Sequence, residues 1–286
     1  MAKKKRKIVL AVAAILLFAL IIWIAWGNKA LELNSYTIAS NKLPDSFNGF
    51  RIAQLSDLHN AEMGTNNEKL ISMLADADPD IIVITGDMID SRNTKVDVAL
   101  SFAEQAVKIA PCYYVTGNHE ARVDEYSDLK DGLIELGVTV LEDAKTEMVC
   151  SGESIVLVGV SDPSFETDYL FGDDETVMQS KLKELISEED GYVILLSHRP
   201  ELFDTYVENK VDLIFSGHAH GGQFRIPFIG GVVAPNQGVF PKYDAGIYSE
   251  GDTNMVVSKG VGNSIIPFRI NNRPEVILIE LTTQGE

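Results

Sequence analysis

The sequence predicts a layered α/β domain that follows a single membrane-spanning helix. Strand-like and helix-like segments alternate through most of the chain, which is the pattern of sheets covered by helices. A charge-free run at residues 8–26 precedes them. Histidine and carboxylate motifs recur directly after the predicted strands, where α/β sheets gather their ligands. We therefore expect residues 1–30 to form a basic N-terminus with a transmembrane anchor, and residues 31–286 to form one domain.

The charge-free run has the length and the flanks of a transmembrane helix. Its 19 residues would rise about 28 Å as a helix, close to the ~30 Å core of a bilayer. Both tryptophans of the chain, Trp23 and Trp26, lie at its far end, where aromatic side chains favour the membrane interface. Basic residues occupy positions 3–7. The positive-inside rule then predicts a cytoplasmic N-terminus and a body on the extracytoplasmic side of the cell membrane.

A cleaved signal peptide is the alternative for this segment. The apolar core of a signal peptide spans about 7–15 residues, which is shorter than the run at 8–26. Ala25-Trp26-Gly27 is the one weak match to the small-residue pattern of a cleavage site. An uncleaved anchor is therefore the preferred interpretation.

The composition excludes some classes of partner. The net charge is −18, and five of the 24 basic residues lie at 3–7, so the remaining 19 face 42 acidic residues. A nucleic-acid partner is not expected, because phosphate backbones are held by basic surfaces. Cys112 and Cys150 are compatible with an exported protein that has at most one disulfide. Two free thiols buried in strands are the preferred interpretation, and their spacing does not fit a zinc site.

The predicted elements follow a short polar connector at residues 27–34. Short apolar runs rich in β-branched residues indicate buried strands, and amphipathic stretches between them indicate helices. The strands are expected at 51–56, 81–85, 113–116, 155–158, 193–196 and 213–215, and the helices at 68–77, 96–109, 126–136, 177–187 and 201–208. Residues 224–241 hold Gly230-Gly231 and three prolines, which indicates an irregular loop.

All five histidines of the chain lie in short polar motifs. Each motif directly follows a predicted strand. Because the carboxyl ends of strands in open α/β sheets gather ligands at one edge, we expect these side chains to converge. The motifs are Asp57-Leu58-His59, Gly86-Asp87, Gly117-Asn118-His119-Glu120, Ser197-His198-Arg199 and Gly217-His218-Ala219-His220.

These motifs supply carboxylate, imidazole and amide oxygen ligands. Such a mixture suits two divalent ions of manganese, iron or zinc, and the lack of thiolates argues against structural zinc or an iron–sulfur cluster. A pair of divalent ions can clamp the entering and leaving oxygens of a displacement at phosphorus. The chain has no Walker loop, no Gly-x-Gly-x-x-Gly after a strand and no Gly-x-Ser-x-Gly, so no other fingerprint competes.

The ordered set of motifs resembles the calcineurin-like metallophosphoesterases. The resemblance covers residues 51–281, and it includes Gly86-Asp87-x-x-Asp90 and Gly217-His218-x-His220. The segment 258–275 is similar to the bacterial membrane-anchored branch, which includes phosphodiesterases and nucleoside-diphosphate-diacylglucosamine pyrophosphatases. The resemblance implies a four-layer α/β/β/α sandwich with metals at the strand ends.

The resemblance also implies a role for each motif residue. His119 would face the substrate, where it would protonate the leaving oxygen or stabilise phosphoryl charge. Asp90 would orient His119, and Glu120 stands where the family often has aspartate. One metal would be held by Asp57, His59, Asp87 and His220, and the other by Asp87, Asn118, His198 and His218, with Asp87 bridging.

The expected function is hydrolysis of a phosphodiester or pyrophosphate by metal-bridging hydroxide. The substrate would be a phosphoester small molecule or, given the anchor, an envelope- or lipid-linked compound. A phosphomonoesterase of the same fold is the alternative. A non-catalytic scaffold is disfavoured because all seven ligand positions and His119 are present.

Other residues near the motifs have two interpretations each. Arg122, Arg199 and Arg225 could contact phosphate, but a surface role or a salt bridge to the acidic body is at least as good an explanation. The apolar loop at 224–241 could meet an acyl chain at the membrane surface, with packing over the sheet as the preferred interpretation.

Overall fold

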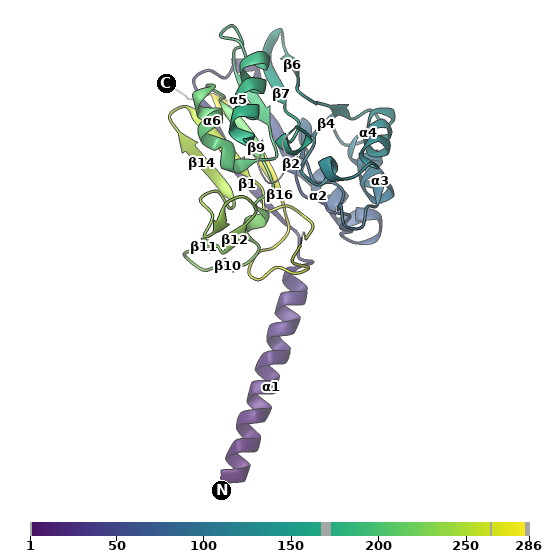
Figure 1. Cartoon of the computed structure of the whole chain (residues 1–286), viewed down its shortest axis with the longest axis vertical. Helices are drawn as coiled ribbons and strands as arrows, with labels where there is room; N and C mark the ends of the chain where they lie inside the picture. The colour runs from purple at the N-terminus through teal and green to yellow at the C-terminus, as the bar shows by residue number, and fades with distance from the viewer. Residues whose placement is uncertain (1, 167–172, 264, 284–286) are drawn as a thin grey trace.

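In the computed structural model, which describes residues 2–166, 173–263 and 265–283, a long helix projects from an α/β body (Figure 1). The helix is α1 (Ala2–Gly27). Its span Lys3–Gly27 is long and apolar enough to cross a membrane. The most apolar stretch of this helix is not buried against the body. The helix predicted from the charge-free run is therefore present and extends over the basic residues before it.

The connector predicted at 27–34 is wrong from residue 32 onward. Strand β1 (Glu32–Ser40) begins there and pairs in parallel with β16 (Glu275–Thr283). Its side chains alternate between half-buried and exposed along most of its length. Such a strand is found at the edge of a sheet with one face solvated, and its polar residues hide the apolar signal.

The first sheet has six strands in the order β1-β16-β2-β3-β4-β5. β16 is antiparallel to β2, whereas β2 to β5 run parallel to one another. The strands after β1 are β2 (Arg51–Leu55), β3 (Ile81–Thr85), β4 (Cys112–Val115) and β5 (Thr139–Val140). Helices α2 (Glu68–Ala77), α3 (Val96–Ala106) and α4 (Tyr126–Glu135) connect them.

The second sheet also has six strands, in the order β14-β15-β9-β8-β7-β6. Its central strands β15, β9, β8 and β7 are parallel, and an antiparallel strand flanks each side. The strands are β6 (Ala144–Cys150), β7 (Glu153–Gly159), β8 (Val193–Leu196), β9 (Leu213–Ser216), β14 (Gly246–Glu250) and β15 (Thr253–Val257). The helices of this half are α5 (Asp174–Leu185) and α6 (Phe203–Glu208).

Alternation along the strands produces three hydrophobic cores and four layers. In β7, Ile155 and Leu157 belong to the core between the two sheets, whereas Val156 and Val158 pack toward α5 and α6. Both faces of the central strands are therefore buried, as expected for parallel strands covered on two sides. The predicted four-layer α/β/β/α sandwich is confirmed.

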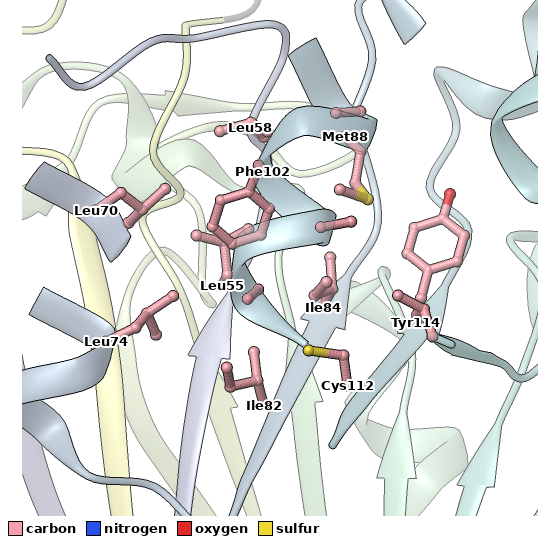
Figure 2. Packing of buried hydrophobic residues seen from close by; sticks show 14 of the residues in the cluster. Leu55, Leu58, Leu70, Leu74, Ile82, Ile84, Met88, Phe102, Cys112 and Tyr114 are labelled. Atoms are coloured by element: carbon pink, nitrogen blue, oxygen red, sulfur yellow. The ribbon is translucent and has the colours of Figure 1, made fainter. Parts of the chain in front are cut away.

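The outer core of the first sheet lies beneath α2 and α3. Figure 2 shows Leu55, Ile84 and Tyr114 of neighbouring strands facing Leu70 of α2 and Phe102 of α3. All of these side chains are buried. This packing fixes the ends of β2, β3 and β4 relative to one another, and those ends carry the first three polar motifs.

The loop predicted at 224–241 contains four very short strands. They form two small hairpins, β10 (Arg225–Ile226) with β11 (Gly230–Gly231) and β12 (Val233–Ala234) with β13 (Gly238–Val239).

Both cysteines are free; Cys112 is buried, as predicted, but Cys150 at the end of β6 is only half-buried.

Candidate metal centre

The predicted site residues converge where the parallel strands of both sheets end. Gln54 of β2 donates hydrogen bonds from Nε2 to Thr85 Oγ1 at 3.0 Å and to the Ser216 carbonyl at 2.8 Å, so it ties the two sheets together. His198 Nδ1 lies 2.7 Å from the Thr85 carbonyl, across the same junction. The candidate ligands Asp57, His59, Asp87, Asn118, His198, His218 and His220 are all buried.

The first group of possible ligands comprises Asp57, His59, Asp87 and His220. Their ligand atoms all lie within 4.8 Å of one another. His59 Nε2 is 3.4 Å from Asp87 Oδ2, and His220 Nε2 is 3.3 Å from Asp57 Oδ1. The two imidazole Nε2 atoms face each other at 3.2 Å.

The second group comprises Asp87, His198 and His218, so Asp87 belongs to both. His198 Nε2 lies 3.3 Å from Asp87 Oδ2 and 3.2 Å from His218 Nδ1. Asn118 Oδ1 is buried in the loop after β4 and has no hydrogen-bond partner within the described chain. An amide oxygen in that state is a suitable oxygen ligand for a cation.

The donor set fits divalent cations. Ligand atoms that lie about 2.0–2.2 Å from a divalent ion are themselves roughly 3.0–3.6 Å apart, and the nitrogen–oxygen and nitrogen–nitrogen spacings between 3.2 and 3.4 Å match this range. Two buried imidazole nitrogens at 3.2 Å also need a proton or a cation between them. The prediction that these motifs form a metal-binding cluster is therefore supported by their geometry.

The charges within the cluster favour ionised carboxylates beside imidazoles of mixed protonation. Burial raises the pKa of Asp57, but His220 and His59 outweigh it and bring that pKa to about 2. Burial lowers the pKa of His220 to about 3 despite the opposing effect of Asp57. Burial also disfavours protonated His198, but Asp87 reverses the effect and raises its pKa to about 10. The charge of Asp87 thus favours the protonated form of His198 when no cation is bound.

Several site residues adopt a left-handed backbone, which is costly for residues other than glycine. It occurs at the first residues after β2, β3 and β9 and turns their side chains toward the cluster. Aspartate and histidine are among the types that tolerate it best. The φ angles are 51° at Asp57, 44° at His59, 52° at Asp87, 65° at His218 and 49° at His220.

The motif glycines leave no room for a side chain. A Cβ on Gly117 would lie 2.7 Å from the Asp87 nitrogen, and one on Gly217 would lie 2.5 Å from Asp57 Oδ2. Both distances are shorter than van der Waals contact. These glycines therefore let the loops after β4 and β9 approach the carboxylates.

His119 lies beside the cluster rather than within it. Its backbone N–H donates to Asp87 Oδ1 at 2.8 Å, and its ring packs edge-on against His59 at 4.5 Å between centroids. Its Nδ1 accepts from the Ser91 N–H at 3.0 Å, so the ring proton belongs on Nε2. Burial lowers the pKa of His119 to about 4, with Asp87 opposing. This imidazole is therefore neutral at neutral pH, with one N–H to donate.

Asp90 lies near His119 but makes its closest bonds elsewhere. Its Oδ1 is 3.7 Å from His119 Nδ1 and accepts from Arg92 Nε at 3.0 Å, and its Oδ2 accepts from Arg92 Nη2 at 2.5 Å. Direct orientation of His119 comes from the backbone of Ser91, which the sequence motifs do not single out. Asp90 closes the turn that presents this N–H, because it accepts from the Arg92 backbone at 2.9 Å.

Glu120 joins two of the motif loops from behind. Its fully buried carboxylate accepts backbone N–H bonds from Asp87 at 2.9 Å, Gly117 at 2.8 Å and Ile89 at 3.3 Å. Burial and the nearby Asp87 raise its pKa to about 7. The residue that departs from the common family pattern is thus a structural clamp between the loops after β3 and β4.

The arginines beside the motifs have different partners. Arg199 is buried against Asp162, with Nε–Oδ2 at 2.5 Å and Nη2–Oδ1 at 2.8 Å. Arg225 pairs with Asp244 at 3.0 Å. Arg122 is exposed. For Arg199 and Arg225 the salt-bridge interpretation is confirmed.

Glu201 is a half-buried neighbour of the centre that sequence patterns did not identify. Its Oε1 lies 3.9 Å from His218 Nε2, while Nδ1 of the same ring faces His198. This separation is longer than a hydrogen bond, so Glu201 places a negative charge near the ring of His218 without bonding to it. Its position three residues after His198 is the only signal for this contact in the sequence.

Comparisons with known proteins agree with this geometry. The model of the family described as calcineurin-like phosphoesterase matches residues 50–222. The uncharacterized metallophosphoesterase YkuE of Bacillus subtilis is 30% identical over 259 residues, which cover 88% of this chain and 85% of that protein. Phosphodiesterase YaeI of Escherichia coli is 27% identical over 248 residues, covering 81% and 82%. A transmembrane protein with metallophosphoesterase domain from Danio rerio is 28% identical over 253 residues, covering 85% of this chain and 56% of that protein. Family model, relatives and site geometry agree, and the chain belongs to the calcineurin-like phosphoesterases.

Proposed function

We propose that this chain hydrolyses phosphodiester or pyrophosphate bonds at a pair of divalent ions. The observation that carries the proposal is the position of Asp87. Its Oδ2 lies 3.4 Å from His59 Nε2 in one group and 3.3 Å from His198 Nε2 in the other. A carboxylate shared in this way suits two ions about 3.5–4 Å apart.

The two groups divide the ligands between the ions. The ions would be manganese, iron or zinc, since imidazole and carboxylate ligands suit all three. When bound, they would supply an activated water as nucleophile and would neutralise charge on the phosphoryl oxygens. One ion would be held by Asp57, His59, Asp87 and His220, and the other by Asp87, Asn118, His198 and His218.

His119 is proposed as the catalytic residue that contacts the substrate. Its Nδ1 accepts from Ser91, so Nε2–H would donate to a phosphoryl or leaving oxygen. Because the pKa of His119 is lowered, the imidazole would donate this hydrogen bond in its neutral form. Asp90 is proposed as a positioning residue, because it holds the turn that carries the Ser91 N–H.

A diester or pyrophosphate substrate is favoured over a monoester. The E. coli relative is named a phosphodiesterase, and the apolar α1 suggests a membrane anchor. An envelope- or lipid-linked phosphoester would be presented to an anchored enzyme at the membrane. Residues 1–30 would form this anchor with a cytoplasmic N-terminus, and residues 31–286 would form the catalytic domain on the extracytoplasmic side. A reporter that works only in the cytosol can be fused to the C-terminus. A signal from this reporter would contradict the extracytoplasmic placement of the catalytic domain.

The chemistry is tested on the full chain in detergent micelles. The protein is stripped of metal, supplied with manganese and assayed on bis-p-nitrophenyl phosphate and on p-nitrophenyl phosphate. We expect the wild type to cleave the diester only when manganese is present. We expect Asp87→Asn to lose both this cleavage and its bound metal. A monoester preference would support the phosphatase alternative. Bound metal without activity on either ester would favour a scaffold.

His119→Ala separates the catalytic role from the ligand roles. It should keep the metal content and lower the rate by about 10²–10⁴, the usual contribution of a positioned proton donor. Metal loss in this variant would contradict the proposed division of roles.

A further inference from the structure

Exposed apolar side chains of the body gather at the end from which α1 projects. Phe228 is fully exposed, Phe240 is 59% exposed and Ile265 is 76% exposed. Figure 1 places β10, β11 and β12 beside the base of α1. Phe228 lies in the turn between β10 and β11, and Phe240 directly follows β13, the partner of β12. We call this group the apolar rim; it comprises Phe228, Ile229, Val239, Phe240, Ile265 and Phe268. Large exposed apolar groups of this kind mark an interaction surface.

A pocket between α1 and the body lies next to this rim. It is lined by Trp23, Trp26, Arg225, Lys259, Arg269 and Arg273. The guanidinium of Arg273 lies 5.3 Å from the Trp26 ring centroid. Asn28, just after α1, bonds the Arg269 carbonyl at 2.9 Å and its N–H at 2.7 Å. These contacts fix the end of α1 to the loop that carries part of the rim.

The pocket is basic on a strongly acidic protein. Among the described residues that line it are four cations and one acid, Glu32, whereas acidic residues outnumber basic ones 42 to 24 in the whole chain. Glu32 pairs with Lys259 and with Arg273, Glu275 also pairs with Lys259, and Asp244 pairs with Arg225, so the four cations face three acids. The guanidinium of Arg269 is held by carbonyl and amide oxygens of Lys259, Gly262 and Asn263. Positive charge beside interfacial tryptophans complements the anionic headgroups of a membrane.

The loops of the rim begin at the candidate metal centre. The Gly262 N–H donates to the Asp57 carbonyl at 2.7 Å, three residues before Ile265. The hairpin that carries Phe228 begins at Arg225, shortly after the 3₁₀ turn His220–Gly222. Arg269 Nη2 lies 3.5 Å from His220 Nδ1, so one side chain joins the pocket to the centre. A surface that covers the rim would therefore lie next to the candidate ligands.

We propose that this face binds the bilayer itself: the apolar rim enters the interface of an anionic leaflet, and the basic pocket faces its phosphate headgroups. α1 would enter the membrane at the same place, so the bilayer is the occupant that the rim meets without any rearrangement. The inference rests on the proposed anchor but not on the proposed chemistry. It brings the candidate centre to phosphoesters at the membrane surface.

Tryptophan quenching in nanodiscs tests this surface in the full chain. The two native tryptophans both lie in α1, so quenching of the wild type by lipids brominated in their acyl chains reports on the anchor alone. Phe228→Trp and Phe240→Trp add a reporter on the rim. Val149→Trp is the matched control, because Val149 is 69% exposed on β6, which Figure 1 places away from α1.

The expected result is that brominated lipid removes most of the added fluorescence of both rim variants and little of that of Val149→Trp. The loss should be larger in anionic than in zwitterionic nanodiscs. Wild-type quenching combined with rim variants that behave like the control would establish the anchor and overturn the bilayer surface. Absence of wild-type quenching would overturn the anchor and the surface together. The added fluorescence of the rim variants could instead be insensitive to brominated lipid and change with the number of chains per disc. That result would show that a second copy of the chain covers the rim, and it would overturn the proposal.

Discussion

Replacement of Asp162 by asparagine should destabilise the body strongly, because it breaks a buried ion pair on one side only. Arg199 is 3% exposed and Asp162 is 1% exposed. The guanidinium meets the carboxylate through two short bonds, Nε–Oδ2 at 2.5 Å and Nη2–Oδ1 at 2.8 Å. Asparagine keeps the size of the side chain but leaves the buried cation without its main counter-charge.

The magnitude follows from what remains around Arg199. Breaking a buried pair by removing one partner costs about 3–5 kcal/mol. Glu201 Oε1 at 3.3 Å and Asp174 Oδ2 at 3.7 Å still face Arg199 Nη1. They offset part of the lost attraction, so we expect a loss near the lower end, about 3 kcal/mol of the free energy of unfolding.

Denaturant titration of the full chain in micelles measures this loss. The near-ultraviolet circular dichroism of the nine tyrosines reports on the body, because tryptophan fluorescence reports only on α1. The control is Glu104→Gln, which removes an exposed i,i+4 pair with Lys108 at 3.3 Å and should cost about 0.3–0.5 kcal/mol. If Asp162→Asn costs no more than this control, the buried pair does not stabilise the body.

The pH dependence of the same pair has a definite sign. Burial raises the pKa of Asp162, but Arg199 outweighs burial and holds that pKa below its ordinary value. A carboxylate with a lowered folded-state pKa stabilises the protein above its ordinary pKa, and this contribution is lost as the pH falls through the folded value. The difference between wild type and Asp162→Asn should therefore shrink under acid conditions.

Three further predictions concern the centre and the core. Gly117→Ala should lower bound manganese measured by mass spectrometry, because its Cβ would lie 2.7 Å from the Asp87 nitrogen, whereas Gly191→Ala, with open space around its Cβ, should not. Metal affinity, measured by chelator competition, should rise across neutral pH by about tenfold per pH unit for each proton displaced; His198, with a pKa near 10, holds such a proton, and a flat profile would contradict this. Leu157→Ala, buried between the sheets, should cost about 2–5 kcal/mol in denaturant titration, and a loss as small as that of exposed Val149→Ala would refute the tight packing of this core.

Elements with an unambiguous local pattern could be predicted to the residue. Strands 81–85 and 193–196 are buried at every position. Because each strand is fully buried, its residues form one apolar run, and the ends of that run mark the ends of the strand. Helix 68–77 has a clear apolar stripe and begins and ends as predicted. Strand β1 could not be recognised, because its polar sequence becomes a strand only through pairing with β16, more than 200 residues later.

The candidate site was predictable for a different reason. Its members lie at strand ends, and strand ends are visible in the sequence even when the order of strands in the sheet is not. Ser91 and Asp162 escaped notice because their roles depend on where a backbone N–H or a single carboxylate lies in space. Neither position has a chemical pattern of its own along the chain.

The residue types at the strand ends suit the backbone conformation there as well as a bound metal. Asp57, His59, Asp87, His218 and His220 all have positive φ, at a cost of order 1–3 kcal/mol each. Aspartate and histidine bear this conformation better than most residues, so the types that suit a divalent ion also suit these turns. The strain is offset in part by hydrogen bonds, such as those from the His218 N–H to the Asp57 carboxylate at 3.2 Å. A bound cation would offset more of it, since any ligand that binds only the folded state stabilises that state. The stability of the body and the filling of its centre should therefore be coupled, and the loops after β2, β3 and β9 are the place where the coupling arises.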